Sequence, residues 1–274
     1  MHKKRITAAF LLLGFTASAQ KGIDQLVRTE KDFAAYSVSH STKEAFEKFI
    51  DSASIMFENG QPVRAVEYWA RRQKRPGVLD WHPQFAEVSL MGSFGYTTGP
   101  WTYRASPADT ISAYGQYSTV WAINKSGEWK FLADFGVDNS GPATPDEKII
   151  TAAKQPAYKE AIAGDETFLK SENGFNARCL TDKQKAYKKW LSRQSILNRN
   201  GSLPAAQPKD RKKLVDQTPD AIQFTTLGWG FSAGSADMAY TYGKALVNGK
   251  DQNYLRVWRK EKKGWKIALE VLRY

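Results

Sequence analysis

The chain ends in YLRVWRKEKKGWKIALEVLRY (Tyr254–Tyr274), and a similar stretch, YSTVWAINKSGEWKFLADFG (Tyr117–Gly136), lies near its middle. In both stretches a β-rich run ends in Val-Trp, a short polar turn follows, and a second tryptophan begins another β-rich run. This pattern predicts a β-hairpin. Because it occurs twice in one chain of 274 residues, it also predicts an internal repeat.

A helical pattern upstream of each hairpin supports the repeat. Eight residues between Ala45 and Gly60 match eight residues between Ala186 and Gly201, all at one common offset of 141 positions. The apolar residues recur at helical spacing, which predicts one buried helix face in each half. Ser41 and Thr181 precede these segments and are the predicted N-caps.

Two further motifs recur in the same order. LDW at Leu79–Trp81 is matched with LGW at Leu227–Trp229, and FGYTTG at Phe94–Gly99 is matched with MAYTYG at Met238–Gly243. Four ordered matches predict a duplicated unit of about the size of an ordinary domain. Helices followed by consecutive strands, without alternation of the two, predict the α+β class.

The order of these motifs resembles the nuclear-transport-factor-2-like superfamily, which includes ketosteroid isomerase and the SnoaL-like proteins. Within it, the chain is similar to exported bacterial members of unknown function. The resemblance implies two tandem cone-shaped domains, each a curved antiparallel sheet wrapped around about three helices, with a conical pocket inside. We expect an N-terminal cone at 22–140, a linker at 141–159 and a C-terminal cone at 160–274.

The first 19 residues have the pattern of an export signal. Lys3–Arg5 are basic, Ile6–Phe15 form an apolar run, and Ala17–Ala19 fit a cleavage site. The apolar run is about half the length that crosses a bilayer. We expect a signal peptide at 1–19 and a protein that is periplasmic or secreted from a bacterium, with no membrane span after cleavage. A retained anchor or a buried first helix is the alternative.

The composition bears on several classes of partner. The formal net charge is +12, and basic residues gather at Lys183–Lys189 and Lys209–Lys213, where they could form an anion-binding surface. Because export is expected, nucleic acid is not an expected partner. Cys179 is the only cysteine, which excludes an intramolecular disulfide. With so few histidines and cysteines, we expect neither a metal nor a cofactor.

Three residues are candidates for acid–base chemistry. Asp134 lies inside an apolar strand, Glu270 has the equivalent place in the second half, and burial would raise the pKa of such a carboxyl. Strict alternation instead places Asp134 beside Lys130, and Glu270 beside Lys266, on a solvated outer face of the sheet. His82 could serve as a general acid or base, and an exposed structural role is its alternative.

Aromatic residues are the candidates for ligand binding. An aromatic-lined cone suits a small apolar or ring-bearing molecule, and the alternative is that these side chains fill the core. The segment Pro100–Gln116 is longer than its counterpart and could cover the mouth of the pocket. The candidates are Tyr36, Trp69, Trp81, Tyr96, Trp101, Tyr103 and Trp121, with second-half equivalents Trp229, Tyr240, Trp258 and Glu270.

These patterns favour a protein that binds a small apolar or aromatic ligand without catalysis. The first alternative is a cofactor-independent isomerase, cyclase or dehydratase that uses Asp134. The second alternative is a structural or protein-interaction module. Members of the superfamily pair across their sheets, so the resemblance implies a homodimer or an intramolecular pseudo-dimer.

Overall fold

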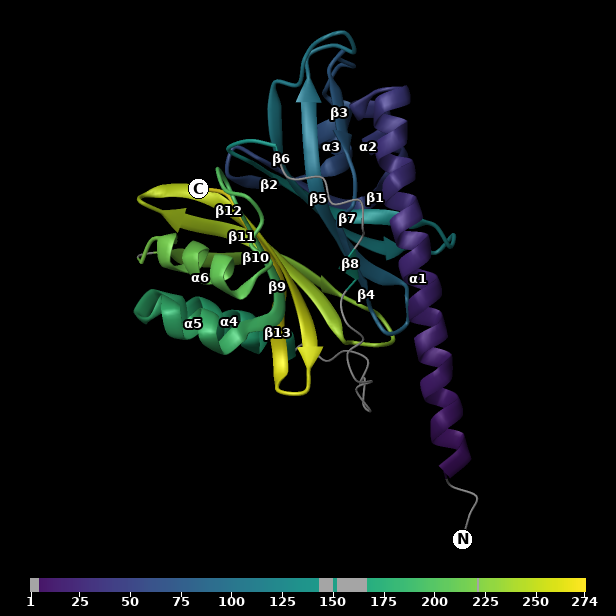
Figure 1. Ribbon diagram of the computed structural model, residues 1–274, viewed down its shortest axis with the longest axis vertical. Helices are drawn as coiled ribbons and strands as arrows, with labels where there is room; N and C mark the ends of the chain where they lie inside the picture. The colour runs from purple at the N-terminus through teal and green to yellow at the C-terminus, as the bar shows by residue number, and fades with distance from the viewer. Residues whose placement is uncertain (1–4, 143–149, 152–166, 221) are drawn as a thin grey trace.

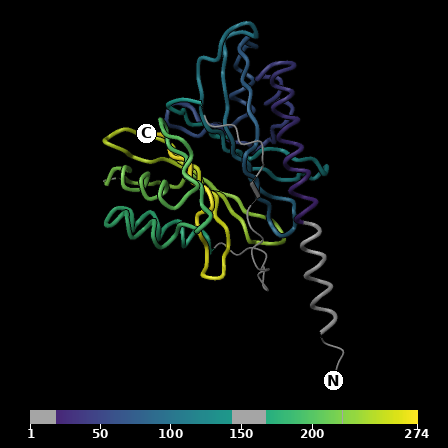
Figure 2. The backbone as a smooth tube through the Cα atoms, in the orientation of Figure 1, coloured from purple at the N-terminus to yellow at the C-terminus, as the bar shows by residue number. Residues whose placement is uncertain are grey.

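The computed structural model describes residues 5–142, 150–151, 167–220 and 222–274. Two sheets pack face to face in the middle of the molecule, and the helices of each half lie on the outer side of their own sheet (Figure 1). The backbone trace shows the two halves of the chain on the two sides of this layer (Figure 2).

The first half contains three helices and most of the larger sheet. Its elements are α1 (Arg5–Ser39), α2 (Thr42–Phe49), β1 (Ile50–Glu58), β2 (Gln61–Arg64), α3 (Ala65–Ala70), β3 (Val78–Trp81), β4 (Phe85–Val88), β5 (Phe94–Arg104), β6 (Ala113–Ile123) and β7 (Trp129–Asp138).

A two-residue strand, β8 (Ile150–Thr151), adds to the edge of this sheet. The second half then contains α4 (Thr167–Thr181), α5 (Lys183–Trp190), β9 (Leu191–Arg199), α6 (Pro208–Gln217), β10 (Gln223–Phe231), β11 (Met238–Val247), β12 (Lys250–Glu261) and β13 (Gly264–Leu272).

The five strands of the smaller sheet follow the order of the central strands of the larger sheet. The strand orders of the larger and the smaller sheet are β2-β1-β7-β6-β5-β4-β8, with β3 also on β5, and β10-β11-β12-β13-β9. In each half, the strand that follows the first two helices lies beside the last strand and runs parallel to it. These pairs are β1 with β7 and β9 with β13. This shared order confirms the α+β class and the two tandem cones. The parallel pairs β1–β7 and β9–β13 correct the expectation of purely antiparallel sheets.

Local hydrogen bonds identify the residues that cap the N-termini of α2 and α5. Ser41 is the N-cap of α2, as predicted, and its hydroxyl accepts from the Glu44 N–H at 3.2 Å. In the second half the N-cap is Asp182 rather than Thr181, because the Asp182 carboxylate accepts from the Lys185 N–H at 2.9 Å. Thr181 instead ends α4.

The strand register changes one of the sequence matches. Trp81 pairs with Trp101, whereas Phe224 pairs with Ala245, the residue that aligns with Trp101 when FGYTTG is laid on MAYTYG. Phe224, not Trp229, therefore stands at the position of Trp81. The match between LDW and LGW does not hold.

A β-bulge in β7 decides which side chains enter the first cone. Val120 pairs with Ala133 and Trp121 with Phe131, which leaves Leu132 as an extra residue. An extra residue reverses the alternation that follows it. Phe131 packs inside the cone while Ala133 faces the other sheet, so Asp134 returns to the cone side. The expectation that Asp134 shares an outer face with Lys130 is therefore wrong.

The last strand of the second half has the same bulge. Val257 pairs with Leu269 and Trp258 with Ile267, so Ala268 is the extra residue. Ile267 packs inside the C-terminal cone, Ala268 faces the other sheet, and the fully buried Glu270 points into the cone. Alternation alone had placed Glu270 outside, on the face of Lys266.

Three apolar clusters make up the core. One fills each cone, and the third lies between the sheets and takes residues such as Phe135 and Leu269 from both halves. An ion pair crosses this layer: Arg259 donates to both carboxylate oxygens of Glu87 at 2.7 and 2.8 Å, and Tyr96 donates to Glu87 at 2.8 Å. The two sheets therefore pack as an intramolecular pair.

The structure also bears on the predicted linker, the predicted mouth loop and the expected absence of a membrane span. The predicted linker at 141–159 lies largely outside the described residues, which include only 141–142 and β8 of it. The expected mouth loop Pro100–Gln116 is mostly strand, because β5 continues to Arg104 and β6 begins at Ala113. Over the described ranges, no helix combines the length and hydropathy that a membrane crossing requires.

Candidate functional site

The N-terminal cone contains a cavity of about 180 Å³. An engineered cavity of about 150 Å³ in another protein holds benzene, so this volume suits a molecule with one ring. Two of its lining residues are acidic or basic, four are aromatic, and the others are a leucine and a glycine. The lining residues are Phe46, Leu79, Trp81, Trp101, Tyr117, Asp134, Gly136 and Arg273.

Two glycines let Trp101 cover one wall of this cavity. Trp101 pairs with Gly115 across β5 and β6, and a Cβ at Gly115 would lie 2.2 Å from the Trp101 ring. A Cβ at Gly136 on β7 would lie 3.5 Å from the indole nitrogen. The ring therefore crosses strands whose own side chains are missing at these positions.

Asp134 is the carboxyl group of the cavity. Thr119, its register partner on β6, donates a hydrogen bond to it at 2.6 Å. Burial raises the pKa of Asp134 to about 6, although the Thr119 bond lowers it in part. Near neutral pH this side chain can gain or lose a proton, which suits both hydrogen bonding and acid–base chemistry.

A second carboxyl group, Glu30 on α1, is enclosed at the base of the cone. It accepts hydrogen bonds from the indoles of Trp81 at 2.6 Å and Trp121 at 3.0 Å, and from Thr97. Burial raises the pKa of Glu30 to about 7, and the charge of Asp134 raises it further. Because Glu30 does not line the cavity, its role is to hold Trp81 in the wall.

The Tyr117 hydroxyl completes the polar groups of the cavity. It is buried and has no hydrogen-bond partner among the described residues. Burial raises the pKa of Tyr117 well above its ordinary value, so the phenol stays protonated. A buried donor without a partner costs free energy that a bound polar group would recover.

The C-terminal cone is filled where the first cone is open. Burial opposes the charge on Glu270, but Arg199 and Arg256 outweigh it and lower the pKa of Glu270. Arg256 donates to Glu270 and to Glu172, both at 2.6 Å, and its guanidinium lies 4.0 Å from the Phe224 ring. Charged side chains that bind one another thus occupy the interior.

Three of the predicted site residues line the cavity: Trp81, Trp101 and Asp134. His82 is exposed and lies outside the lining, so the cavity offers it no catalytic role. Trp121 is fully buried against Glu30.

The remaining first-half candidates lie elsewhere. Trp69 packs on Phe46 with ring centroids 4.5 Å apart, and Tyr36 stacks on the outer His40. Tyr96 faces the layer between the sheets, and Tyr103 is exposed.

The second-half candidates do not line the N-terminal cavity either. Trp258 and Glu270 belong to the buried polar network, Tyr240 packs in the layer between the sheets, and Trp229 is 39% exposed.

Four residues of this candidate site were not predicted from the sequence: Glu30, Tyr117, Gly136 and Arg273. Glu30 carried a signal, since E-x-x-F at Glu30–Phe33 recurs at Glu172–Phe175. Tyr117 and Gly136 lie within the recognised hairpin, but only the bulge reveals which side they face. Arg273 had no sequence signal, because it reaches the cavity from the other half of the chain.

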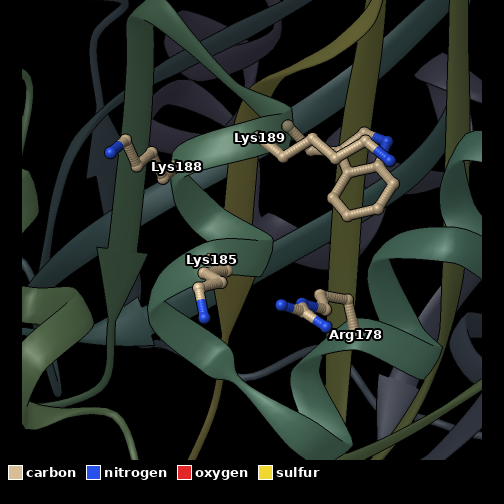
Figure 3. Close-up of a pocket in the computed structure, with 5 residues that line it drawn as sticks. Arg178, Lys185, Lys188 and Lys189 are labelled. Carbon is tan, nitrogen blue, oxygen red and sulfur yellow. The ribbon is translucent and has the colours of Figure 1, made fainter.

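A second hollow, of about 570 Å³, lies on the outer surface of α4 and α5 (Figure 3). The Arg178 side chain points toward the side of the hollow on which Lys185 lies, while Lys188 points away. Asp182 binds Lys185 at 2.9 Å and lies 3.8 Å from Arg178. The predicted basic surface is further reduced because Lys183 is buried and donates to the Thr218 carbonyl.

The described part of the chain offers no cluster of three or more His, Cys, Asp or Glu side chains that could hold a metal. The polar groups of the cavity are a carboxyl, a phenol and a guanidinium, which suit hydrogen bonding and proton transfer.

No family model matches the sequence, and no curated protein matches it. Similar solved structures include an NTF2-like protein from Cytophaga hutchinsonii, 12% identical over 41% of this chain and 98% of its own, with a TM-score of 0.33. A protein of unknown function with a cystatin-like fold from Nostoc punctiforme is 14% identical over 42% of this chain and 93% of its own, with a TM-score of 0.34. Nuclear transport factor 2 from Cryptosporidium parvum is 10% identical over 42% of this chain and 98% of its own, also with a TM-score of 0.34. These likenesses concern the fold alone.

Proposed function

We propose that the N-terminal cone binds a small ring-bearing molecule in the cavity at Asp134, and that the filled C-terminal cone supports it through the sheet layer. The observation that carries this proposal is the open aromatic cavity with one carboxyl group in its wall. Ligand sites in proteins combine apolar walls with few polar groups in this way.

The aromatic walls supply most of the binding free energy in this proposal. Trp81, Trp101 and Phe46 present ring faces and edges to the cavity, and such contacts favour a planar apolar ligand. Asp134 and Tyr117 then fix its orientation. A hydroxyl or amine of the ligand donates to Asp134, and an acceptor takes the free Tyr117 proton.

Binding of para-cresol tests the proposal, because it has one ring and one hydroxyl. We expect calorimetry to detect binding by the wild type and a loss of about tenfold or more in Trp101→Ala. Trp229→Ala is the matched control, since Trp229 is exposed and far from the lining. Binding should weaken as the pH falls through about 6, when Asp134 loses its negative charge. Equal affinity in both variants would contradict the proposal.

We further propose that the chain is a duplicated NTF2-like unit that acts outside the cytoplasm. The shared strand order, the paired bulges and the two E-x-x-F segments support the duplication. The basic and apolar pattern of residues 1–19 supports export. Mass spectrometry of the mature N-terminus from expressing bacteria tests the export proposal, and cleavage after Ala19 is the expected result.

The second candidate function is a cofactor-independent isomerase. The observation that favours it is that Asp134 and the Tyr117 phenol share one cavity and that the pKa of Asp134 is raised to about 6. Asp134 would remove a proton from a carbon next to a carbonyl, and Tyr117 would donate a hydrogen bond to the carbonyl oxygen.

Deuterium incorporation into a β,γ-unsaturated cyclic ketone, followed by NMR in heavy water, separates the two functions. An isomerase incorporates deuterium next to the carbonyl, and Asp134→Asn abolishes the incorporation. A binding protein takes up the ketone without exchange above the rate in buffer.

A further inference from the structure

Arg273 enters the N-terminal cavity from the opposite half of the chain. It follows β13, and its backbone N–H donates to the Asn253 carbonyl at 3.1 Å within the C-terminal sheet. Its side chain leaves that sheet, donates to the Gly136 carbonyl on β7, and lines the cavity. The guanidinium carbon lies 5.1 Å from the centroid of the Phe135 ring. The cavity is therefore incomplete without the second cone.

The Arg273 guanidinium is short of negative partners. Among the described residues, no carboxylate lies within ion-pair distance of it. Burial lowers the pKa of Arg273, and the charge of the exposed Asp138 offsets this only in part. Three buried arginines differ, since Arg199, Arg256 and Arg259 bind carboxylates directly. Arg211 is also buried and donates to backbone carbonyls only, but it does not line the cavity.

We infer that the ligand of the N-terminal cavity is an aromatic carboxylate whose anionic group binds Arg273. This inference rests on the proposed function and specifies its ligand class. A guanidinium offers paired N–H donors that match a carboxylate, and such charge-assisted bonds exceed neutral ones in strength. The ring lies between Trp81 and Trp101, and a donor on the far side of the ring reaches Asp134.

This assignment gives the second cone a role in binding. Its C-terminal segment supplies the anion contact, while the first cone supplies the aromatic walls and Asp134. Ligand binding then links the two halves, because the ligand contacts β7 of one half and the residue after β13 of the other.

The test compares para-hydroxybenzoate with its neutral amide, para-hydroxybenzamide, by calorimetry at pH 8. The two probes share a ring and a hydroxyl and differ in charge. We expect the wild type to bind the carboxylate about tenfold more tightly than the amide. Arg273→Gln should remove that preference, whereas Arg273→Lys, which keeps the positive charge, should keep part of it. Arg193→Gln, at an exposed arginine outside the lining, is the matched control.

The outcomes separate this inference from the proposed function. Equal wild-type affinities for the two probes overturn the carboxylate assignment and leave ring binding intact. A preference that persists in Arg273→Gln also overturns it, because the anion would then bind elsewhere. If neither probe binds and para-cresol also fails, the binding function itself is overturned.

Discussion

The two cones have the same hydrogen-bonded carboxylate at their base and differ in the residues next to it. In the N-terminal cone, Glu30 accepts hydrogen bonds from Thr97 and from the indole of Trp121. In the C-terminal cone the same hydrogen bonds are formed by Glu172, Thr241 and Trp258. The equivalence shows that a buried carboxylate, a threonine and a tryptophan set the base of both units.

Above this base, the two cones differ at a pair of facing residues on their last two strands. The register pairs Thr119 with Asp134 in the first half and Arg256 with Glu270 in the second. Thr119 is short and leaves space beside Asp134, whereas Arg256 spans the interior and binds two carboxylates. Asp134, bonded to Thr119, keeps a raised pKa beside a cavity, whereas Glu270, paired with Arg199 and Arg256, is part of a filled core.

Breaking the charge network of the C-terminal cone should have the largest effect. Arg256→Met keeps much of the side-chain length but leaves Glu172 and Glu270 without their shared cation. Removing one partner of a buried ion pair typically costs about 3–5 kcal/mol of unfolding free energy. Urea unfolding measures this loss.

The matched control is Arg193→Met, at an exposed arginine, which should cost less than about 0.5 kcal/mol. If Arg256→Met is as stable as the control, the charge network does not stabilise the second cone. The two cones would then differ in structure but not in how ion pairs contribute to their stability.

The pH dependence should run in opposite directions in the two cones. Burial raises the pKa of Glu30 to about 7, so the folded state holds its proton more tightly than the unfolded state. Its stabilising contribution is complete below the unfolded pKa and is lost as the pH rises through about 7. The pKa of Glu270 is lowered, so its contribution is present above the unfolded pKa and is lost as acid protonates it.

Unfolding free energies between pH 4.5 and pH 8 measure the first effect. We expect a loss of about 3 kcal/mol from Glu30 as the pH rises, because one pKa unit corresponds to about 1.4 kcal/mol. Glu30→Gln should reduce this slope to the part that Asp134, whose pKa is also raised, contributes, and Glu172→Gln in the second cone should not reduce it. An unchanged slope in Glu30→Gln would show that Glu30 does not titrate in this range.

The sequence predicted the frame of the molecule better than its interior. The Val-Trp hairpins and the helix matches identified two α+β units, because core packing repeats apolar residues at fixed spacing. The facing of Asp134 could not be predicted, because the bulge at Leu132 shifts the alternation and bulges leave little trace in a single sequence. Arg273 was invisible for another reason, since its contact with Gly136 joins residues 137 positions apart.

Filling the open cone should make it resemble the closed one. Gly136 pairs with Tyr117 as Leu272 pairs with Tyr254, so Gly136→Leu places in the first cone the side chain that the second cone already has. Four added carbons in a cavity of about 180 Å³ exclude a ring. We expect para-cresol affinity to fall by about tenfold or more, equivalent to about 1.4 kcal/mol, in calorimetry.

Gly127→Ala, in an exposed hairpin turn outside the cavity, serves as the control for a glycine change in the same hairpin. It should lower stability, because Gly127 has a positive φ, but it should leave para-cresol affinity unchanged. Retained affinity in Gly136→Leu would place the para-cresol site elsewhere.

The smallest effect should come from Thr119→Val, which removes one hydroxyl at nearly constant shape. In the wild type the hydrogen bond from Thr119 lowers the pKa of Asp134. The loss of this bond in Thr119→Val should therefore raise that pKa above about 6. We expect a stability loss of about 1 kcal/mol at pH 8, where Asp134 is ionised, and a smaller loss at pH 5, where it holds a proton. Carboxyl-carbon NMR follows the titration directly, and Thr102→Val, outside the lining on β5, is the control. An Asp134 midpoint that stays in place in Thr119→Val would mean that burial alone sets its pKa. The difference between the cones would then depend on the arginine at 256 and not on the threonine at 119.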